Sequence, residues 1–221
     1  MIADATWDGV DAPLAAQFAI LSSRLGGDAE PLPDNELAQL VEQARAGDTG
    51  ARRRLYLQLV DPVFRTVRGM LHNDADAEDV TQDALLTMMT SLDRYRPRAD
   101  TRFSTWVMTI TLNTLRRRFR RRRPEPTATG EMPDLVDVSA ADPGDNIDRA
   151  RQRRALLVAL SELSERERTI VSLRYGAELN ASEIATVVGV EPATVRKALE
   201  RARARLGDRI ETLLNPDGGT R

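Results

Sequence analysis

The chain has 221 residues, of which 41% are hydrophobic and 30% charged, and its formal net charge is −2. These values are typical of a soluble globular protein with one large or two small domains, and an aromatic content of 4% argues against an aromatic-rich β-sandwich. The absence of cysteine excludes disulfides and thiolate metal sites, and the single histidine, His72, leaves little for acid–base chemistry. We therefore expect no cofactor and no catalytic site.

Residues 1–33 are predicted to form an N-terminal extension. They carry acidic residues where a signal peptide needs basic ones, and no apolar run in the chain approaches the roughly 20 residues that span a bilayer. We therefore expect a cytoplasmic protein without membrane contact. The stretch "LAAQFAILSSRL" predicts one short amphipathic helix, and the rest of the extension is expected to be largely flexible.

Residues 34–123 are predicted to form a four-helix bundle. Asp34 is expected to cap a first helix that ends at Gly47, and a second helical pattern follows, in which Pro62 predicts a kink or a restart. A third helix is expected from about Ala75 to Leu92 and a fourth from Phe103. Their apolar positions recur at three- and four-residue spacings, as in helices packed around one core.

The third predicted helix carries an acidic stripe. Asp76, Asp79 and Asp83 recur at i, i+3 and i+7, beside Gln82. A calcium loop is excluded, since Asp79 stands where such a loop needs glycine and its twelfth position is leucine. Favourable interaction with the helix dipole explains Asp76 better than Asp83. The stripe therefore predicts a protein-docking face.

The fourth predicted helix ends in arginines, which make up seven of the eight residues 116–123. One or two cations suit a helix C-terminus, but seven repel one another and predict an external polyanion such as a phosphate backbone. Phe103 and Trp106, earlier in the same helix, either stack on unpaired bases or belong to the core.

Residues 124–148 hold seven acidic residues, four prolines and no basic residue, which predicts a flexible linker. Residues 149–213 are predicted to form a second helical domain, followed by a flexible tail, 214–221. The sequences "SERE" at 164–167 and "NASE" at 180–183 predict capping boxes. The fold class is therefore all-α, with two helical domains joined by an acidic linker.

The stretch "EIATVVGVEPATVRKALERARARL" has the form of a helix-turn-helix, with the turn at Gly189 and Pro192 opening the second helix. A plain helical hairpin with a solvated charged face is the alternative. In the helix-turn-helix interpretation, the second helix directs these residues away from the core and toward DNA: Thr194, Arg196, Lys197, Glu200, Arg201 and Arg203.

Taken in order, "DAEDVTQDALL", "DRYRP", "FSTWVMTITLN", the arginine run, the acidic linker and "LSERERTIVSLRY" followed by the helix-turn-helix resemble the extracytoplasmic-function group of bacterial sigma factors. The resemblance covers about residues 34–213. It implies an RNA polymerase specificity subunit, whose region 2 binds core polymerase and melts the −10 promoter element and whose region 4 reads the −35 element. The implied partners are core RNA polymerase, through its clamp helices and flap, and promoter DNA; an anti-sigma protein is a further candidate.

The resemblance also implies roles for individual positions. Asp76, Asp79, Gln82 and Asp83 match the face that docks on the clamp helices. The residues implied at the −10 element are Arg96, Arg98, Thr101, Phe103, Trp106, Asn113, Arg116, Arg117 and Arg120. Four positions depart from the usual pattern of the family, Leu112 and Arg117 near the −10 asparagine and Ala198 and Glu200 in the last helix, so the promoter sequence stays open.

Two other classes of protein compete with this interpretation. A free-standing helix-turn-helix regulator explains residues 150–213 but leaves the acidic stripe and the arginine run without a partner. An enzyme, such as a nuclease, is disfavoured because the sequence has one histidine and no convergent carboxylate cluster.

Overall fold

The computed structural model describes residues 12–21, 32–71, 73–98, 101–122 and 147–215. These ranges hold nine α-helices and one 3₁₀ turn. In chain order they are α1 (Ala12–Ala19), α2 (Asp34–Arg45), α3 (Thr49–Met70), α4 (Asp74–Ser91), η1 (Leu92–Arg94), α5 (Phe103–Arg122), α6 (Ile147–Ser161), α7 (Glu165–Gly176), α8 (Ala181–Val188) and α9 (Pro192–Leu214). The described residues contain no β-strand, only an isolated bridge between Arg98 and Thr101. The all-α prediction is confirmed.

The predicted linker, 124–148, lies outside the described residues except for its last two, which begin α6. The tail lies outside them beyond Asn215, and so does His72.

Both predicted capping boxes are confirmed. At the start of α7, the Glu167 backbone N–H donates to the Ser164 hydroxyl, and the Ser164 N–H donates to the Glu167 carboxylate at 3.2 Å. At the start of α8, Asn180 and Glu183 make the same reciprocal pair. Each box satisfies backbone donors that a helix start leaves without an intrahelical acceptor.

One local prediction was wrong, and one of the two alternatives for another is excluded. Pro33, not Asp34, occupies the N-cap of α2, and Asp34 lies in the first helical turn, where its charge still suits the helix dipole. Pro62 does not restart a helix, because α3 runs without interruption from Thr49 to Met70. The apolar side chains of α3 on either side of Pro62, including Leu59 and Val63, are buried in one core, and this packing outweighs the local preference of proline.

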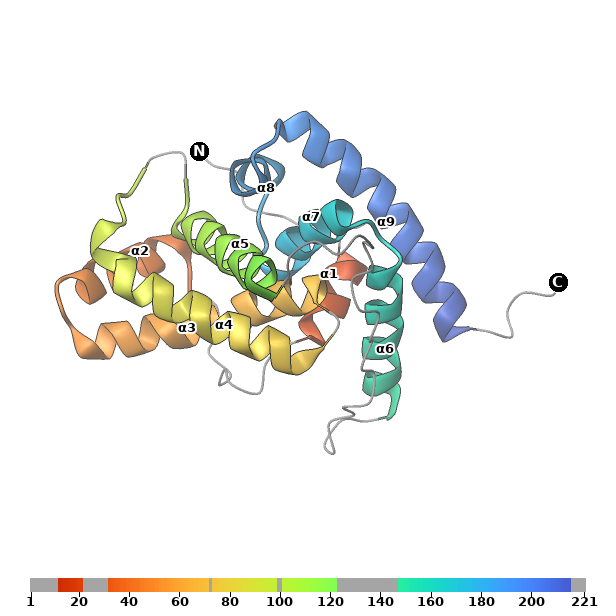
Figure 1. The fold of residues 1–221 in the computed structure, drawn as a ribbon, viewed down its shortest axis with the longest axis horizontal. Helices are drawn as coiled ribbons and strands as arrows, with labels where there is room; N and C mark the ends of the chain where they lie inside the picture. Colours follow the sequence, from red (N-terminus) through yellow and green to blue (C-terminus); the bar gives the residue numbers. More distant parts are fainter. Residues whose placement is uncertain (1–11, 22–31, 72, 99–100, 123–146, 216–221) are drawn as a thin grey trace.

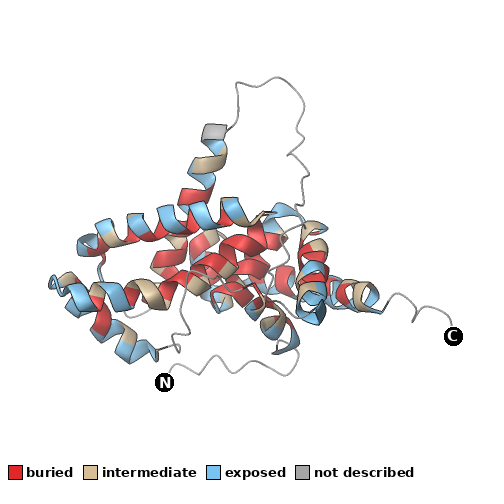
Figure 2. Cartoon of the chain, turned by 90° about the horizontal axis from the view of Figure 1, so that it is seen from below, coloured by how far each residue is buried: buried red, intermediate tan, exposed pale blue. Residues whose placement is uncertain are grey.

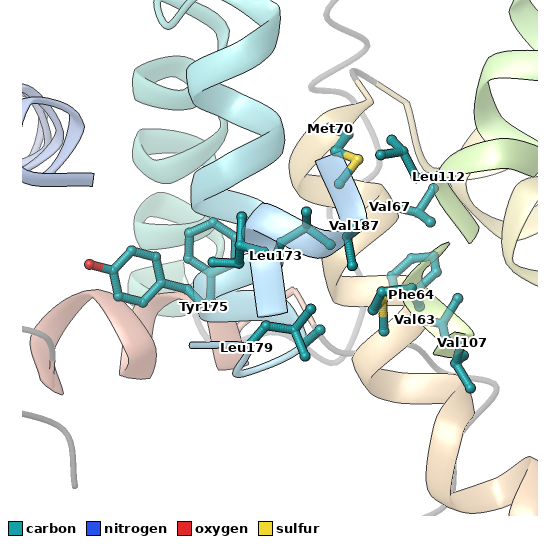
Figure 3. Packing of buried hydrophobic residues seen from close by; sticks show 14 of the residues in the cluster. Val63, Phe64, Val67, Met70, Val107, Leu112, Leu173, Tyr175, Leu179 and Val187 are labelled. Atoms are coloured by element: carbon teal, nitrogen blue, oxygen red, sulfur yellow. The ribbon is translucent and has the colours of Figure 1, made fainter. Parts of the chain in front are cut away.

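The helices form two halves that pack against each other. The first half comprises α2–α5 and the second half α6–α9, and α1 lies at their junction (Figure 1). One continuous apolar cluster runs through both halves. Figure 3 shows Val67 and Met70 of α3 and Leu112 of α5 on one side of this cluster, with Leu173 of α7 and Val187 of α8 facing them. The two predicted domains therefore share a core in this structure.

The packing of the halves is centred on the contact between α3 and α7. A glycine lies at the contact on each helix. A Cβ at Gly69 would lie 2.5 Å from the Ser172 hydroxyl oxygen, and a Cβ at Gly176 would lie 2.7 Å from the backbone nitrogen of Thr66. Real Cβ atoms do not approach other atoms so closely. The contact therefore requires glycine at position 176, where the obstacle is backbone, whereas at position 69 the nearest atom is the end of the Ser172 side chain.

Charged pairs surround this contact. The Arg102 guanidinium, just before α5, donates to both carboxylate oxygens of Glu183 on α8, at 2.5 and 2.7 Å. On another side of the interface, Asp74 at the start of α4 accepts from Arg68 of α3 and, at 2.7 Å, from Arg153 of α6. These pairs connect the first half to the second at two separate places.

We expect Gly176→Ala to destabilise the protein by about 1–3 kcal/mol, as overpacked cores do. The new methyl group would meet the Thr66 backbone, which cannot rotate away as a side chain can. Gly207→Ala in α9 is the control, because a Cβ there has nothing within 4 Å. Relief of the helix penalty of glycine should stabilise that variant by up to about 1 kcal/mol. Urea unfolding measures both, and equal stabilisation of the two variants would contradict the close contact.

Candidate nucleic-acid and protein-docking surfaces

The acidic residues predicted on the third helix share one face of α4. We call Asp76, Asp79, Gln82 and Asp83 the acidic face. Asp79, Gln82 and Asp83 are exposed and Asp76 is half-buried. The helix orients them because Ala77, Val80 and Ala84, on its other side, are buried. The interaction of this face with polymerase stays a prediction.

An arginine that the sequence analysis did not single out crosses this face. The Arg118 guanidinium of α5 lies 2.6 Å from a carboxylate oxygen of Asp79, 3.3 Å from Asp76 and 4.0 Å from Asp83. Its side chain is 22% exposed. Arg118 therefore neutralises part of the acidic stripe and fixes α5 to α4. Arg118 stands in a run of arginines, so the sequence alone did not indicate that it pairs with the acidic face.

The neighbouring arginines have a different environment. Arg116, Arg117 and Arg120 are exposed, as is Asn113 one turn earlier. We call these three arginines the basic end of α5. Figure 2 shows this end of the helix projecting from the body of the protein. The burial of residues 121 and 122, which end α5, is not described. Cations held on a projecting helix end can approach a polyanion without displacing other parts of the chain.

The aromatic residues at the start of α5 form a cluster with Tyr95. The ring centroids of Phe103 and Tyr95 are 4.9 Å apart in an edge-to-face contact, and those of Trp106 and Tyr95 are 5.1 Å apart. Phe103 is 6% exposed and is a core residue, whereas Trp106 is half-buried and keeps part of its indole at the surface. Of the two rings, only that of Trp106 can reach a stacking partner without rearrangement.

The loop before α5 places three more of the predicted residues near this cluster. Arg98 and Thr101 face each other across the isolated bridge, where the Thr101 N–H donates to the Arg98 carbonyl at 3.3 Å. The exposed Arg96 guanidinium donates to the Asp93 carbonyl at 2.7 Å, which turns it back toward η1.

The helix-turn-helix is formed by α8, a turn and α9. Gly189 ends α8 with φ +75°, a conformation that glycine adopts without strain, and Pro192 occupies the first turn of α9. Five of the six predicted residues are exposed on α9, namely Thr194, Arg196, Lys197, Glu200 and Arg201. Arg203, the sixth, is half-buried and interacts within the protein, and its contact with DNA stays a prediction. Arg203 is half-buried because Ala202 and Leu206, on the same side of α9, are core residues.

The charged groups at the interface between the halves are arranged to remain ionised. Burial lowers the pKa of Arg68, and its pairing with Asp74 opposes this effect. Hydrogen bonding to Glu183 raises the pKa of Arg102. Burial likewise lowers the pKa of Arg168. Arginine stays protonated throughout the physiological range, so these residues act as fixed cations rather than as proton donors.

The residues that the structure describes contain no group of three or more histidine, cysteine or acidic side chains that could hold a metal ion. None of the helices described is long and apolar enough to cross a membrane.

The fold and its surfaces define a class of protein, a two-part helical transcription factor in which a helical bundle is joined to a helix-turn-helix. Two family profiles match the chain, Sigma-70 region 2 over residues 55–125 and Sigma-70 region 4 over residues 153–206. The chain belongs to the extracytoplasmic-function group of RNA polymerase sigma factors.

Individual relatives agree with this assignment. The chain is 32% identical to the extracytoplasmic-function sigma factor BldN of Streptomyces coelicolor, over 78% of this chain and 66% of that protein. It is 29% identical to the RNA polymerase sigma-H factor of Pseudomonas aeruginosa, over 80% of this chain and 94% of that protein. The solved structure of CnrH in complex with the cytosolic domain of CnrY has a TM-score of 0.57 at 24% identity and covers 81% of this chain and 97% of CnrH, which shows a shared fold.

We expect Arg118→Ala to lower the free energy of unfolding by about 1 kcal/mol at low ionic strength, because the three carboxylates then lose the guanidinium that lies within 4.0 Å of each of them. The loss should shrink at high salt, which screens their repulsion. Arg116→Ala, two residues away and exposed, removes the same charge and should change stability by less than about 0.5 kcal/mol. Denaturant unfolding at two salt concentrations makes the comparison, and equal losses in both variants would show that Arg118 has no special role.

Proposed function

We propose that this chain directs core RNA polymerase to a specific set of promoters, binding polymerase through the first half and promoter DNA through both halves. The observation that carries the proposal is the segregation of charge. An acidic face on α4 and cationic helices at the end of α5 and along α9 occur in one chain whose net charge is only −2. A partner made only of nucleic acid would have no use for the exposed carboxylates of Asp79 and Asp83.

The acidic face is proposed to dock on the clamp helices of core polymerase. Asp79 and Asp83 are 58% and 55% exposed, so they can pair with a partner without any change in α4. Gln82 lies between them and is exposed as well. Arg118 occupies one side of these carboxylates, which leaves the outward side for the partner.

The first half is proposed to engage the −10 element. The basic end of α5 would hold phosphates, with Asn113 exposed one turn before it. Trp106 is proposed to support the unpaired bases, and Arg96, Arg98 and Thr101 to line the loop that receives one of them. Phe103, which is buried, would contribute indirectly by fixing the positions of Tyr95 and Trp106.

The second half is proposed to read the −35 element. A helix such as α9 fits the major groove, with the residues near its N-terminus closest to the bases. Arg196 and Lys197 lie there and are exposed, whereas Arg201 lies farther along and is suited to phosphate. CnrH was solved with the cytosolic domain of CnrY, and a regulatory protein of the anti-sigma type is a further candidate partner of this chain.

Run-off transcription with purified core polymerase on a promoter library tests the proposal. We expect transcripts from a subset of promoters only when the chain is present. Asp79→Lys with Asp83→Lys should weaken polymerase binding by more than about tenfold, since like charges at an interface cost several kcal/mol.

Glu36→Lys with Asp93→Lys is the matched control, because both residues are exposed acids of the first half outside the acidic face. Circular dichroism establishes that each variant is folded. Equal weakening by both pairs would indicate a general charge effect, and no weakening by either would remove the acidic face from the polymerase interface.

A second prediction concerns base recognition by α9. Arg196→Ala should cost about 1–3 kcal/mol and relax the preference at one base pair of the −35 element. Arg201→Ala should weaken all promoter variants alike, because phosphate contacts carry no sequence information. Binding to a panel of −35 variants distinguishes them. A uniform loss with Arg196→Ala would assign Arg196 to the backbone and shift the register of the recognition helix.

A further inference from the structure

The helix α1 contacts both halves of the protein at once. It packs against α3 of the first half and against α6 and α7 of the second. Leu14, Phe18 and Leu21, at spacings of four and three residues, are buried, while Ala16 on the opposite side is exposed. A segment of ten described residues thereby has a well-defined apolar side in a position that both halves share (Figure 1).

The side chain of Phe18 contacts both halves of the protein. The ring centroid of Phe18 lies 5.5 Å from that of Tyr175 on α7. The same ring lies against α3, where its Cε1 atom would be 3.0 Å from a Cβ at Gly69. Phe18 has no exposed surface. Its burial therefore depends on α3 and α7 remaining together.

The packed arrangement cannot read two distant promoter elements. Positions −10 and −35 differ by about 25 base pairs, which at roughly 3.4 Å per pair is about 85 Å of duplex. Here Arg102, next to α5, is bonded to Glu183 of α8, and α9 begins nine residues later at Pro192. A helix of 23 residues such as α9 is itself only about 35 Å long. The two halves must separate before both DNA-directed helices can reach their elements.

The interface has the properties of a contact that can open. It buries polar groups, including Arg68, Arg168 and Glu183, in the manner of interfaces between domains that move. Among the described residues, the Ser172 hydroxyl and the Gln17 side-chain oxygen are buried without a hydrogen-bond partner. Exposure to water on opening would satisfy both atoms, which favours the separated state.

We propose that α1 is an intramolecular strap, which packs against α3, α6 and α7 and holds the two halves in a closed form unable to engage a promoter. The proposal rests on the proposed function for the meaning of the closed form, but the closure itself does not depend on it. Binding of polymerase and promoter would shift the chain to an open form, against the contacts of Phe18, Leu14 and Leu21.

The test uses fluorescence energy transfer within the full chain. The absence of cysteine allows specific labelling at Asn35→Cys on α2 and Thr186→Cys on α8, two exposed positions near the Arg102–Glu183 bridge. Phe18→Asp should lower the transfer efficiency of the isolated protein and raise the affinity of its complex with core polymerase for a promoter with both elements about tenfold or more, equivalent to at least about 1.4 kcal/mol. Ala16→Asp adds the same charge to the exposed side of α1 and should leave both measurements unchanged.

The outcomes are distinct. Unchanged transfer in Phe18→Asp, or an equal fall in Ala16→Asp, overturns the strap. Phe18→Ala, a milder change, should lie between wild type and Phe18→Asp. If both Phe18 variants lose helical circular dichroism, the ring is part of one indivisible core and the strap is overturned as well. Energy transfer that responds as expected in a chain that supports no transcription would retain the strap and refute the proposed function.

Discussion

The close approach of α3 and α7 determines how the rest of this protein is arranged. Two helices from different halves can meet so closely because Gly176 has no side chain where it faces the Thr66 backbone, and Gly69 faces Ser172 at the same contact. At this contact Phe18 packs against both helices, and α8 lies against α5, where Arg102 and Glu183 pair. A side chain at Gly176 would meet this backbone, separate the helices and weaken all of these contacts together.

The charges of the chain are separated according to the partners that we propose. The acidic face lies on α4, and the exposed arginines lie at the end of α5 and along α9. Arg118 is the exception, because it pairs with the acidic face and thereby holds the helix of the basic end in place. One arginine in the run thus has a structural role, while its neighbours Arg116 and Arg117 remain available at the surface.

The sequence predicted best what depends on a few neighbouring residues. A capping box needs only residues three positions apart, and both boxes are present as expected. The acidic stripe was predicted for the same reason, since helical spacing alone places Asp79 and Asp83 on one face. The family could be recognised because the order of its motifs along the chain is specific.

Features that depend on distant residues were not predicted. Nothing local distinguishes Arg118 from Arg117, because its role depends on Asp79, thirty-nine residues away in the chain. The half-burial of Arg203 was not predicted either, because Arg203 lies at the border between the core side of α9 and its exposed side. The burial of Phe18 likewise requires two helices that the sequence assigns to separate domains.

In the arrangement that we propose, the chain is closed when isolated and open when it directs polymerase to a promoter. The most direct test is energy transfer between labels at positions 35 and 186, measured while the chain is bound to core polymerase on a promoter with both elements. We predict high transfer in the isolated chain and a large fall in the promoter complex. An initiating complex in which transfer stays as high as in the isolated chain would show that the halves read DNA without separating, and would contradict the account.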